Sequence, residues 1–214
     1  MIESFINALP DQKDYYFQCI DMTENSNSIQ IKVTLVGTEP AIWRRIIIPS
    51  TVSFFDLHHI LQISMGWKNS HLFEFHVGDY RIGHIDKQFE DSDELADALV
   101  VQADLLLGKE NATCIYVYDF GDHWEHALEV ERVEPANDRI LPVCIDGYLN
   151  CPPEDCGGIP GFRNILEILN DKKHPEYRKT KTWVGKGYDE AKFEIDKINK
   201  QLPKYKEYLR HWKK

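Results

Sequence analysis

The order of hydrophobic patterns along this 214-residue chain restricts its fold more than any other feature. Alternating apolar and polar residues, typical of strands, dominate before residue 134, whereas helical spacing of apolar residues dominates after residue 160. A doubly wound α/β sheet needs strands and helices that alternate, so their separation predicts an α+β domain. We expect a mostly antiparallel sheet with one helix packed on a sheet face and a helical C-terminal part.

One helix interrupts the strand-rich half. Apolar residues recur at spacings of three and four between positions 54 and 65, Ser53 can cap the first turn, and Gly66 can end the last. The rest of the pattern predicts strands at 29–36, 43–48, 71–77, 80–85, 114–120 and 124–133, a loop with a short helix at 86–97, a short element at 103–107, an irregular segment at 136–160, and helices from 162 onward.

The chain is long enough for one substantial core with extensions at its ends. We expect an N-terminal extension over residues 1–28, an α+β domain over 29–200, and a basic C-terminal helix over 201–214. The first ten residues have neither a basic start nor a long apolar run, and no stretch approaches the roughly 18 apolar residues of a membrane span. The sequence predicts a cytoplasmic protein without a membrane segment.

Three of the five cysteines, Cys144, Cys151 and Cys156, lie within thirteen positions of a segment rich in Pro and Gly. An odd cysteine count without an export signal argues against disulfides and favours metal or catalytic roles for clustered thiols. Zinc accepts thiolate, imidazole and carboxylate ligands, although no Cys-x-x-Cys pair is present. The alternative, which the sequence favours, is that the thiols fill small apolar gaps and Glu154 or Asp155 caps backbone amides.

A second cluster of polar residues surrounds the turn that is predicted between the strands at 114–120 and 124–133. On an extended strand Trp124 and His126 share one face, and His123 and Glu125 share the other. We therefore expect His126 to join Cys144, Cys151 and Cys156 if zinc is bound, with Asp119, Asp122, His123, Trp124 and Glu154 as further candidate site residues. The alternative is that the aspartates satisfy turn amides and the histidines are ordinary packed or solvated residues.

Two adjacent arginines follow Trp43 on a predicted strand, so Arg44 and Arg45 must point to opposite sheet faces. Either one is a candidate for holding a phosphate or carboxylate group, and simple pairing with acidic residues is the favoured alternative.

The net charge of −10 conceals a division along the chain. Residues 171–214 contain 14 Lys and Arg against 7 Asp and Glu, a charge of +7, which leaves 11 against 28, or −17, for residues 1–170. A basic tail that docks on or offsets an acidic body is the favoured explanation. Nucleic-acid binding through the basic C-terminal segment is the alternative.

Several strings together resemble one known family. They are Ile-Trp-Arg-Arg at 42–45, Met-Gly-Trp at 65–67, His-Leu-Phe-Glu-Phe at 71–75, Tyr-Asp-Phe-Gly-Asp-His-Trp-Glu-His at 118–126 and Cys-Pro-Pro-Glu-Asp-Cys-Gly-Gly at 151–158. The chain resembles the plasmid pRiA4b ORF-3-like family between about residues 29 and 199. The resemblance implies a roll-like α+β fold of uncharacterised function, and some relatives carry the label of mobile-element resolvases.

Three functional hypotheses follow. The first is a cytoplasmic binding or structural domain in which the hairpin at 119–126 and the loop at 144–158 pack together and enclose a metal, with zinc as the candidate cofactor. The second is a metal-dependent hydrolase with Glu125 or Glu154 as general base. The third is a DNA-binding protein of a mobile element that uses the basic tail.

Overall fold

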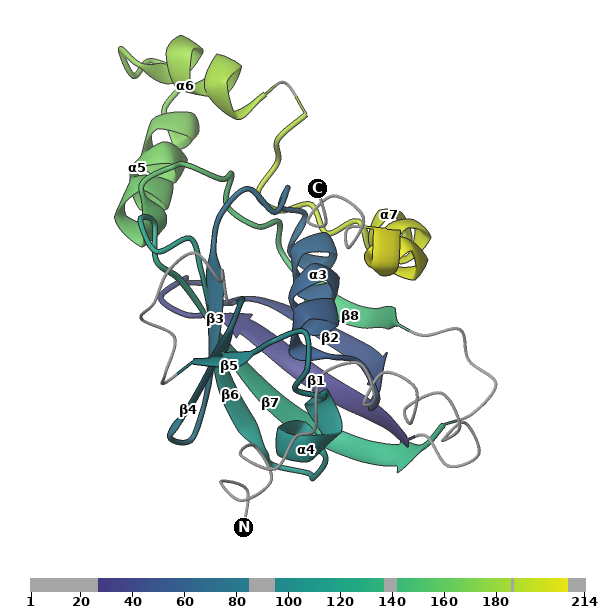
Figure 1. Cartoon of the computed structure of the whole chain (residues 1–214). Helices are drawn as coiled ribbons and strands as arrows, with labels where there is room; N and C mark the ends of the chain where they lie inside the picture. The colour runs from purple at the N-terminus through teal and green to yellow at the C-terminus, as the bar shows by residue number, and fades with distance from the viewer. Residues whose placement is uncertain (1–26, 85–94, 137–141, 186, 208–214) are drawn as a thin grey trace.

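The computed structural model describes residues 27–84, 95–136, 142–185 and 187–207, and the expected N-terminal extension lies almost entirely outside them. The described residues form an eight-stranded sheet with five α-helices, which confirms the predicted α+β class. Figure 1 shows the sheet curling around helix α3, which gives the expected roll-like arrangement. No helix within the described ranges has the length and apolar character needed to cross a bilayer.

The sheet has the strand order β5-β4-β3-β6-β7-β1-β2-β8, and every neighbouring pair is antiparallel except β4 with β5. Strand β1 pairs with β7 on one side and β2 on the other, and β6 pairs with β7 and β3. The strands are β1 (Asn27–Leu35), β2 (Ile42–Pro49), β3 (Phe73–Val77), β4 (Tyr80–Gly83), β5 (Leu95–Asp97), β6 (Thr113–Tyr118), β7 (Trp124–Pro135) and β8 (Val143–Tyr148).

Helix α3 (Phe54–Met65) is buried along almost its whole length and covers one face of the sheet. Its first turn is capped as predicted, because the Ser53 hydroxyl accepts a hydrogen bond from the Asp56 backbone N–H at 3.0 Å. Gly66 ends the helix in a left-handed conformation, with φ of 84°. The alternate residues of β1 that face the helix are fully buried: Ile29, Ile31, Val33 and Leu35.

Two strands depart from the sequence prediction. The segment expected to be irregular contains β8, which pairs with β2 and thereby covers what would otherwise be an open sheet edge. Strand β5 lies in the acidic stretch predicted as a loop with a short helix, whose residues before 95 are not among those described. Strand β8 pairs with a strand that is distant in sequence, and β5 has only three residues paired with β4, so neither has a periodic pattern long enough to predict it.

The remaining helices are α4 (Ala103–Leu107), α5 (Gly158–Asn170), α6 (Tyr177–Val184) and α7 (Ile195–Gln201), followed by the 3-10 helix η2 (Leu202–Glu207). Helices α5 and α6 extend beyond one end of the sheet, whereas α7 lies beside α3 (Figure 1). In the predicted helix over 201–214, Gln201 ends α7, residues 202–207 form η2, and residues 208–214 lie outside the description.

The C-terminal part docks on the body through hydrogen bonds and packing. The Asn199 side chain forms two hydrogen bonds of 2.8 Å with the backbone of Cys144, so it extends the edge of β8. The Phe193 ring covers the guanidinium of Arg44, with 4.7 Å between the guanidinium carbon and the ring centroid. Within the described ranges no ion pair joins residues 171–207 to the rest of the chain, so docking does not depend on direct charge pairing.

Candidate functional site

Three loops that carry the family-like strings meet at one end of the sheet. They are the connection from α3 to β3 (residues 66–72), the turn from β6 to β7 (119–123) and the segment before α5 (149–157). The Gly157 backbone N–H donates to Asp122 Oδ2 at 3.1 Å, and the Asp119 backbone N–H donates to the Leu72 carbonyl at 2.9 Å. The predicted packing of the cysteine-bearing loop against the hairpin is therefore present.

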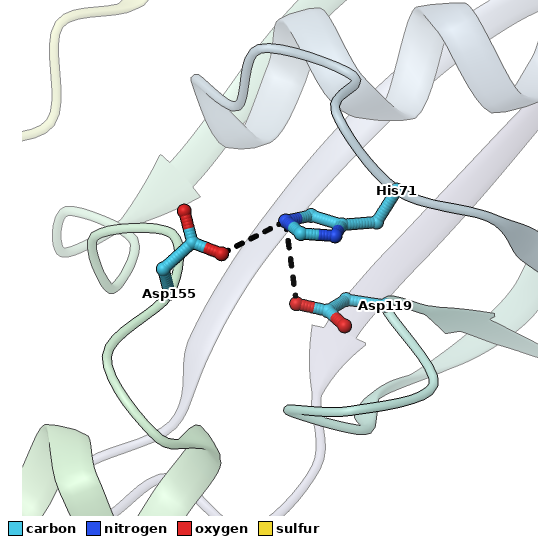
Figure 2. A group of neighbouring side chains, drawn as sticks. All are labelled: His71, Asp119 and Asp155. Carbon is cyan, nitrogen blue, oxygen red and sulfur yellow. Dashed lines mark ion pairs between the residues drawn. The ribbon is translucent and has the colours of Figure 1, made fainter.

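At this junction His71 lies between two carboxylates (Figure 2). Its Nε2 is 3.0 Å from Asp155 Oδ1 and 3.5 Å from Asp119 Oδ2. Among the described residues these three form the one group of three or more His, Cys, Asp or Glu side chains whose ligand atoms lie within 4.8 Å of one another. We call His71, Asp119 and Asp155 the acidic cluster.

The Nε2 atom of His71 is inaccessible to solvent and has no hydrogen-bond partner of acceptable geometry, although both carboxylates are near it. The ring itself is held edge-on against Tyr118, with 5.8 Å between centroids. The ring nitrogens Trp124 Nε1 and His126 Nε2 are buried in the same way, but only His71 Nε2 among these three has two carboxylate oxygens within 3.5 Å. It points into a space bounded by carboxylate oxygens, which is the environment of a metal ligand.

The two carboxylates are positioned by left-handed backbone. Asp119 has φ of 59° and Asp155 has φ of 58°, a region that Asp tolerates better than most residues. In Asp119 the Oδ1 atom accepts hydrogen bonds from the backbone N–H groups of Gly121 at 2.9 Å and Asp122 at 3.3 Å. This leaves Oδ2 directed at His71, so Asp119 presents a single oxygen to the cluster.

Hydrogen bonds of Glu154 hold in place the segment that contains Asp155. Glu154 Oε1 accepts a hydrogen bond of 2.7 Å from the Tyr118 hydroxyl, and its Oε2 accepts one of 3.1 Å from the backbone N–H of Lys68. The Trp67 indole adds a third connection by donating to the Pro152 carbonyl at 2.9 Å. Glu154 therefore holds two of the three loops together.

The zinc ligands predicted from the sequence do not converge in this structure. No three of His126, Cys144, Cys151 and Cys156 have ligand atoms within 4.8 Å of one another, and all four are among the described residues. Cys144 lies in β8, where its Sγ contacts the Asp146 carbonyl at 3.4 Å, and Cys151 lies 3.1 Å from Arg44 Nη2. The shared Pro-Gly-rich segment places the thiols in different surroundings because β8 and the following loop diverge.

Burial makes the thiols poor nucleophiles and ligands, since the thiolate is the reactive form. Loss of solvation raises the pKa of Cys144 to about 11 and that of Cys156 to about 12. Burial also raises the pKa of Cys151, and the nearby Arg44 opposes this only in part. These side chains instead behave as small apolar residues, as the alternative interpretation of the sequence expected.

Trp124 and His126 share one face of β7 as predicted, whereas His123 lies in the turn before the strand, with φ of 55°. Trp124 and His126 are fully buried beneath Trp67, whereas Glu125 on the outer face pairs with His123 at 3.0 Å. Burial lowers the pKa of His126 to about 4, so its ring is neutral. His126 Nδ1 lies 3.2 Å from the Tyr116 carbonyl, which makes it a core residue and not a member of the acidic cluster.

His71 and Asp155 are the functional candidates that sequence reasoning missed. The sequence pattern places His71 only at the start of a strand and Asp155 only as a candidate cap for backbone amides. Both lie in strings that carry the family resemblance, and that was the available signal.

The sequence profile of the family described as Plasmid pRiA4b ORF-3-like protein matches residues 27–197. The uncharacterized protein y4hQ of Sinorhizobium fredii (strain NBRC 101917 / NGR234) is 37% identical over 176 residues, which are 81% of this chain and 90% of that protein. The protein of unknown function MM3350 from Methanosarcina mazei Go1 has a similar crystal structure, with a TM-score of 0.72 at 31% identity. That match covers 80% of this chain and 97% of the other.

Proposed function

The chain belongs to the plasmid pRiA4b ORF-3-like family, and we propose that it is a binding protein for a divalent metal ion, with His71, Asp119 and Asp155 as ligands. The relatives found carry no assigned activity, so support for this proposal comes from the acidic cluster itself. The observation that carries it is the position of His71 Nε2, a buried atom that lies 3.0 and 3.5 Å from two carboxylate oxygens.

The spacing of the ligand atoms supports a shared ion. Two ligands that bind one zinc ion tetrahedrally at about 2.1 Å are roughly 3.4 Å apart. The distances from His71 Nε2 to the two carboxylate oxygens, 3.0 and 3.5 Å, bracket that value. One imidazole with two carboxylates suits first-row divalent ions such as Zn²⁺ and Mn²⁺ better than a thiolate-selective ion.

Three protein ligands would leave a coordination position open, unlike closed four-ligand structural sites. The Asp155 side chain is 69% exposed, so a ligand or solvent can reach this side of the cluster. An open position is also needed for metal-assisted hydrolysis, but both predicted general bases are engaged. Glu154 accepts two hydrogen bonds and Glu125 pairs with His123, so we favour binding over catalysis.

The test is calorimetric titration of chelator-treated protein with Zn²⁺ and Mn²⁺. We expect one ion per chain, and we expect Asp119→Asn and Asp155→Asn each to weaken binding by at least about tenfold. Asn suits both positions because it tolerates the left-handed backbone, and at 119 its Oδ1 can still accept the two turn hydrogen bonds.

Glu125→Gln is the matched control. Glu125 also lies 3.0 Å from an imidazole nitrogen, that of His123, but this pair has no second carboxylate. The metal affinity of the Glu125→Gln variant should equal that of the wild type. Absence of stoichiometric binding, or an equal loss in Glu125→Gln, would contradict the proposal.

A further inference from the structure

A second site lies on the other side of the 66–72 connection. A cavity of about 430 Å³ opens between the end of α3, strand β2 and the C-terminal residues that dock there. Four basic side chains line it against one acidic side chain, Glu194. The basic residues are Arg44, Lys68, Lys192 and Lys197, and we call this cavity the basic pocket.

Arg44 lines the basic pocket and is unusual in its environment. It is 2% exposed, and its guanidinium donates to the carbonyls of Ser64, Trp43 and Tyr148 and to the Cys151 sulfur. No carboxylate of the described residues lies within ion-pair distance of it. Buried charges are ordinarily paired, but the positive charge of Arg44 has no counter-charge among the described residues.

The hydrogen bonds of Arg44 leave capacity for a ligand. A guanidinium has five N–H donors, and the four contacts above occupy one on Nε, two on Nη1 and one on Nη2. The second N–H of Nη2 has no acceptor among the described residues, and Arg44 lines the pocket. The opposite surface of the guanidinium is covered by the Phe193 ring, which fixes the fork in position.

The lysines at the mouth are only partly neutralised. Glu194 pairs with Lys192 at 2.9 Å and with Lys197 at 3.8 Å, so one carboxylate is shared by two ammonium groups. Lys68 is exposed and contributes a further positive charge at the rim. The lining therefore has an excess of about three positive charges, which suits a dianion better than a single carboxylate.

We propose that the basic pocket binds a small phosphate monoester, with Arg44 beneath the phosphoryl group and Lys68, Lys192 and Lys197 around it. The cavity is within the volume range of small-molecule sites and is large enough for an organic group beside the phosphate. Trp67 and Met65 supply apolar wall for that group.

The test is calorimetric titration of the full chain, kept in chelator, with inorganic phosphate, glycerol phosphate and glycerol. Chelator prevents phosphate from binding through a metal at the acidic cluster, so failure of the metal proposal does not affect this result. We expect both phosphates to bind and glycerol not to bind. Lys68→Gln and Lys192→Gln should each weaken phosphate binding by about fivefold or more, since each removes a charge at the mouth.

Lys200→Gln is the control, because Lys200 is exposed on the same helix as Lys197 but does not line the pocket. Unchanged binding in this variant, with losses in the pocket variants, supports the proposal. Absence of phosphate binding at millimolar concentration would overturn it. The proposal would also be overturned if Lys200→Gln lost as much phosphate affinity as the pocket variants and the chain bound duplex DNA more tightly than phosphate. That result would indicate a diffuse basic surface.

Discussion

The acidic cluster and the basic pocket share the 66–72 connection but differ in where their charged groups lie and what holds them. In the acidic cluster the charges are carried by loop side chains, and Asp155 is largely exposed. In the basic pocket the central charge, Arg44, is part of the core and is held by backbone carbonyls. The geometry of the acidic cluster therefore depends on contacts between loops, whereas the geometry of the basic pocket depends on the sheet and on α3.

Replacement of Arg44 should have the largest effect on this comparison. In Arg44→Met three carbonyls lose this donor, one in a buried and two in partly buried hydrogen bonds, at about 1 kcal/mol each, so the free energy of unfolding should fall by about 3 kcal/mol. Arg45→Met is the control on the same strand, because Arg45 is partly exposed and pairs with Glu131, a contact worth about 0–1 kcal/mol. Denaturant unfolding measures both, and equal stability of the two variants would show that the hydrogen bonds of Arg44 do not stabilise the fold.

Acid should weaken the core that supports both sites. Burial lowers the pKa of His126 to about 4 from 6.5, so the unfolded chain takes up a proton as the pH falls below 6.5 and the folded chain does not until about 4. The free energy of unfolding should therefore decrease as the pH falls through this window, by roughly 3 kcal/mol from His126. Thermal unfolding between pH 7 and 4 measures this, and His126→Gln should reduce the slope. If the dependence of stability on pH were the same in His126→Gln as in the wild type, His126 would not be the group responsible.

Gly158 tests the dependence of the acidic cluster on loop contact. A Cβ at this position would lie 2.4 Å from the Asp122 carbonyl oxygen, and φ is +64°. Gly66 also has a positive φ, of 84°, but a Cβ there meets nothing within 4 Å. Gly66→Ala should cost roughly 1 kcal/mol, and Gly158→Ala at least roughly twice that, with weaker metal binding. Equal stability and metal affinity in the two variants would show that the close approach has no importance.

The smallest expected effect comes from Tyr118→Phe. This change removes the hydroxyl that donates to Glu154 and accepts from the Ser70 backbone N–H, so we expect a loss of about 1 kcal/mol in stability and a modest loss of metal affinity. Tyr148→Phe is the control, since Tyr148 is 49% exposed, and it should change stability by less than about 0.5 kcal/mol. A larger effect in Tyr148→Phe would contradict the role given to Glu154.

The sequence predicted the local elements well where the pattern was periodic. The Ser53 cap, helix α3 and its end at Gly66 are where the spacing indicated, as is the burial of Trp124 and His126 on one face of β7. Strand β8 was missed because its edge pairing with β2 depends on residues about 100 positions away. The domain boundaries predicted at residues 28 and 200 stay predictions.

For the candidate site, the sequence singled out the hairpin at 119–126 and the loop at 144–158, which contain Asp119 and Asp155, and it placed His71 only in a string of the family resemblance. It also determined that the chain has an acidic body and a basic tail, because composition and spacing are properties of consecutive residues. Only the tertiary structure decided that His71, Asp119 and Asp155 meet and that the cysteines do not. The physical reason is that proximity between distant segments is set by strand order: pairing of β3 with β6 brings residue 71 beside residue 119, and packing before α5 brings residue 155 to both.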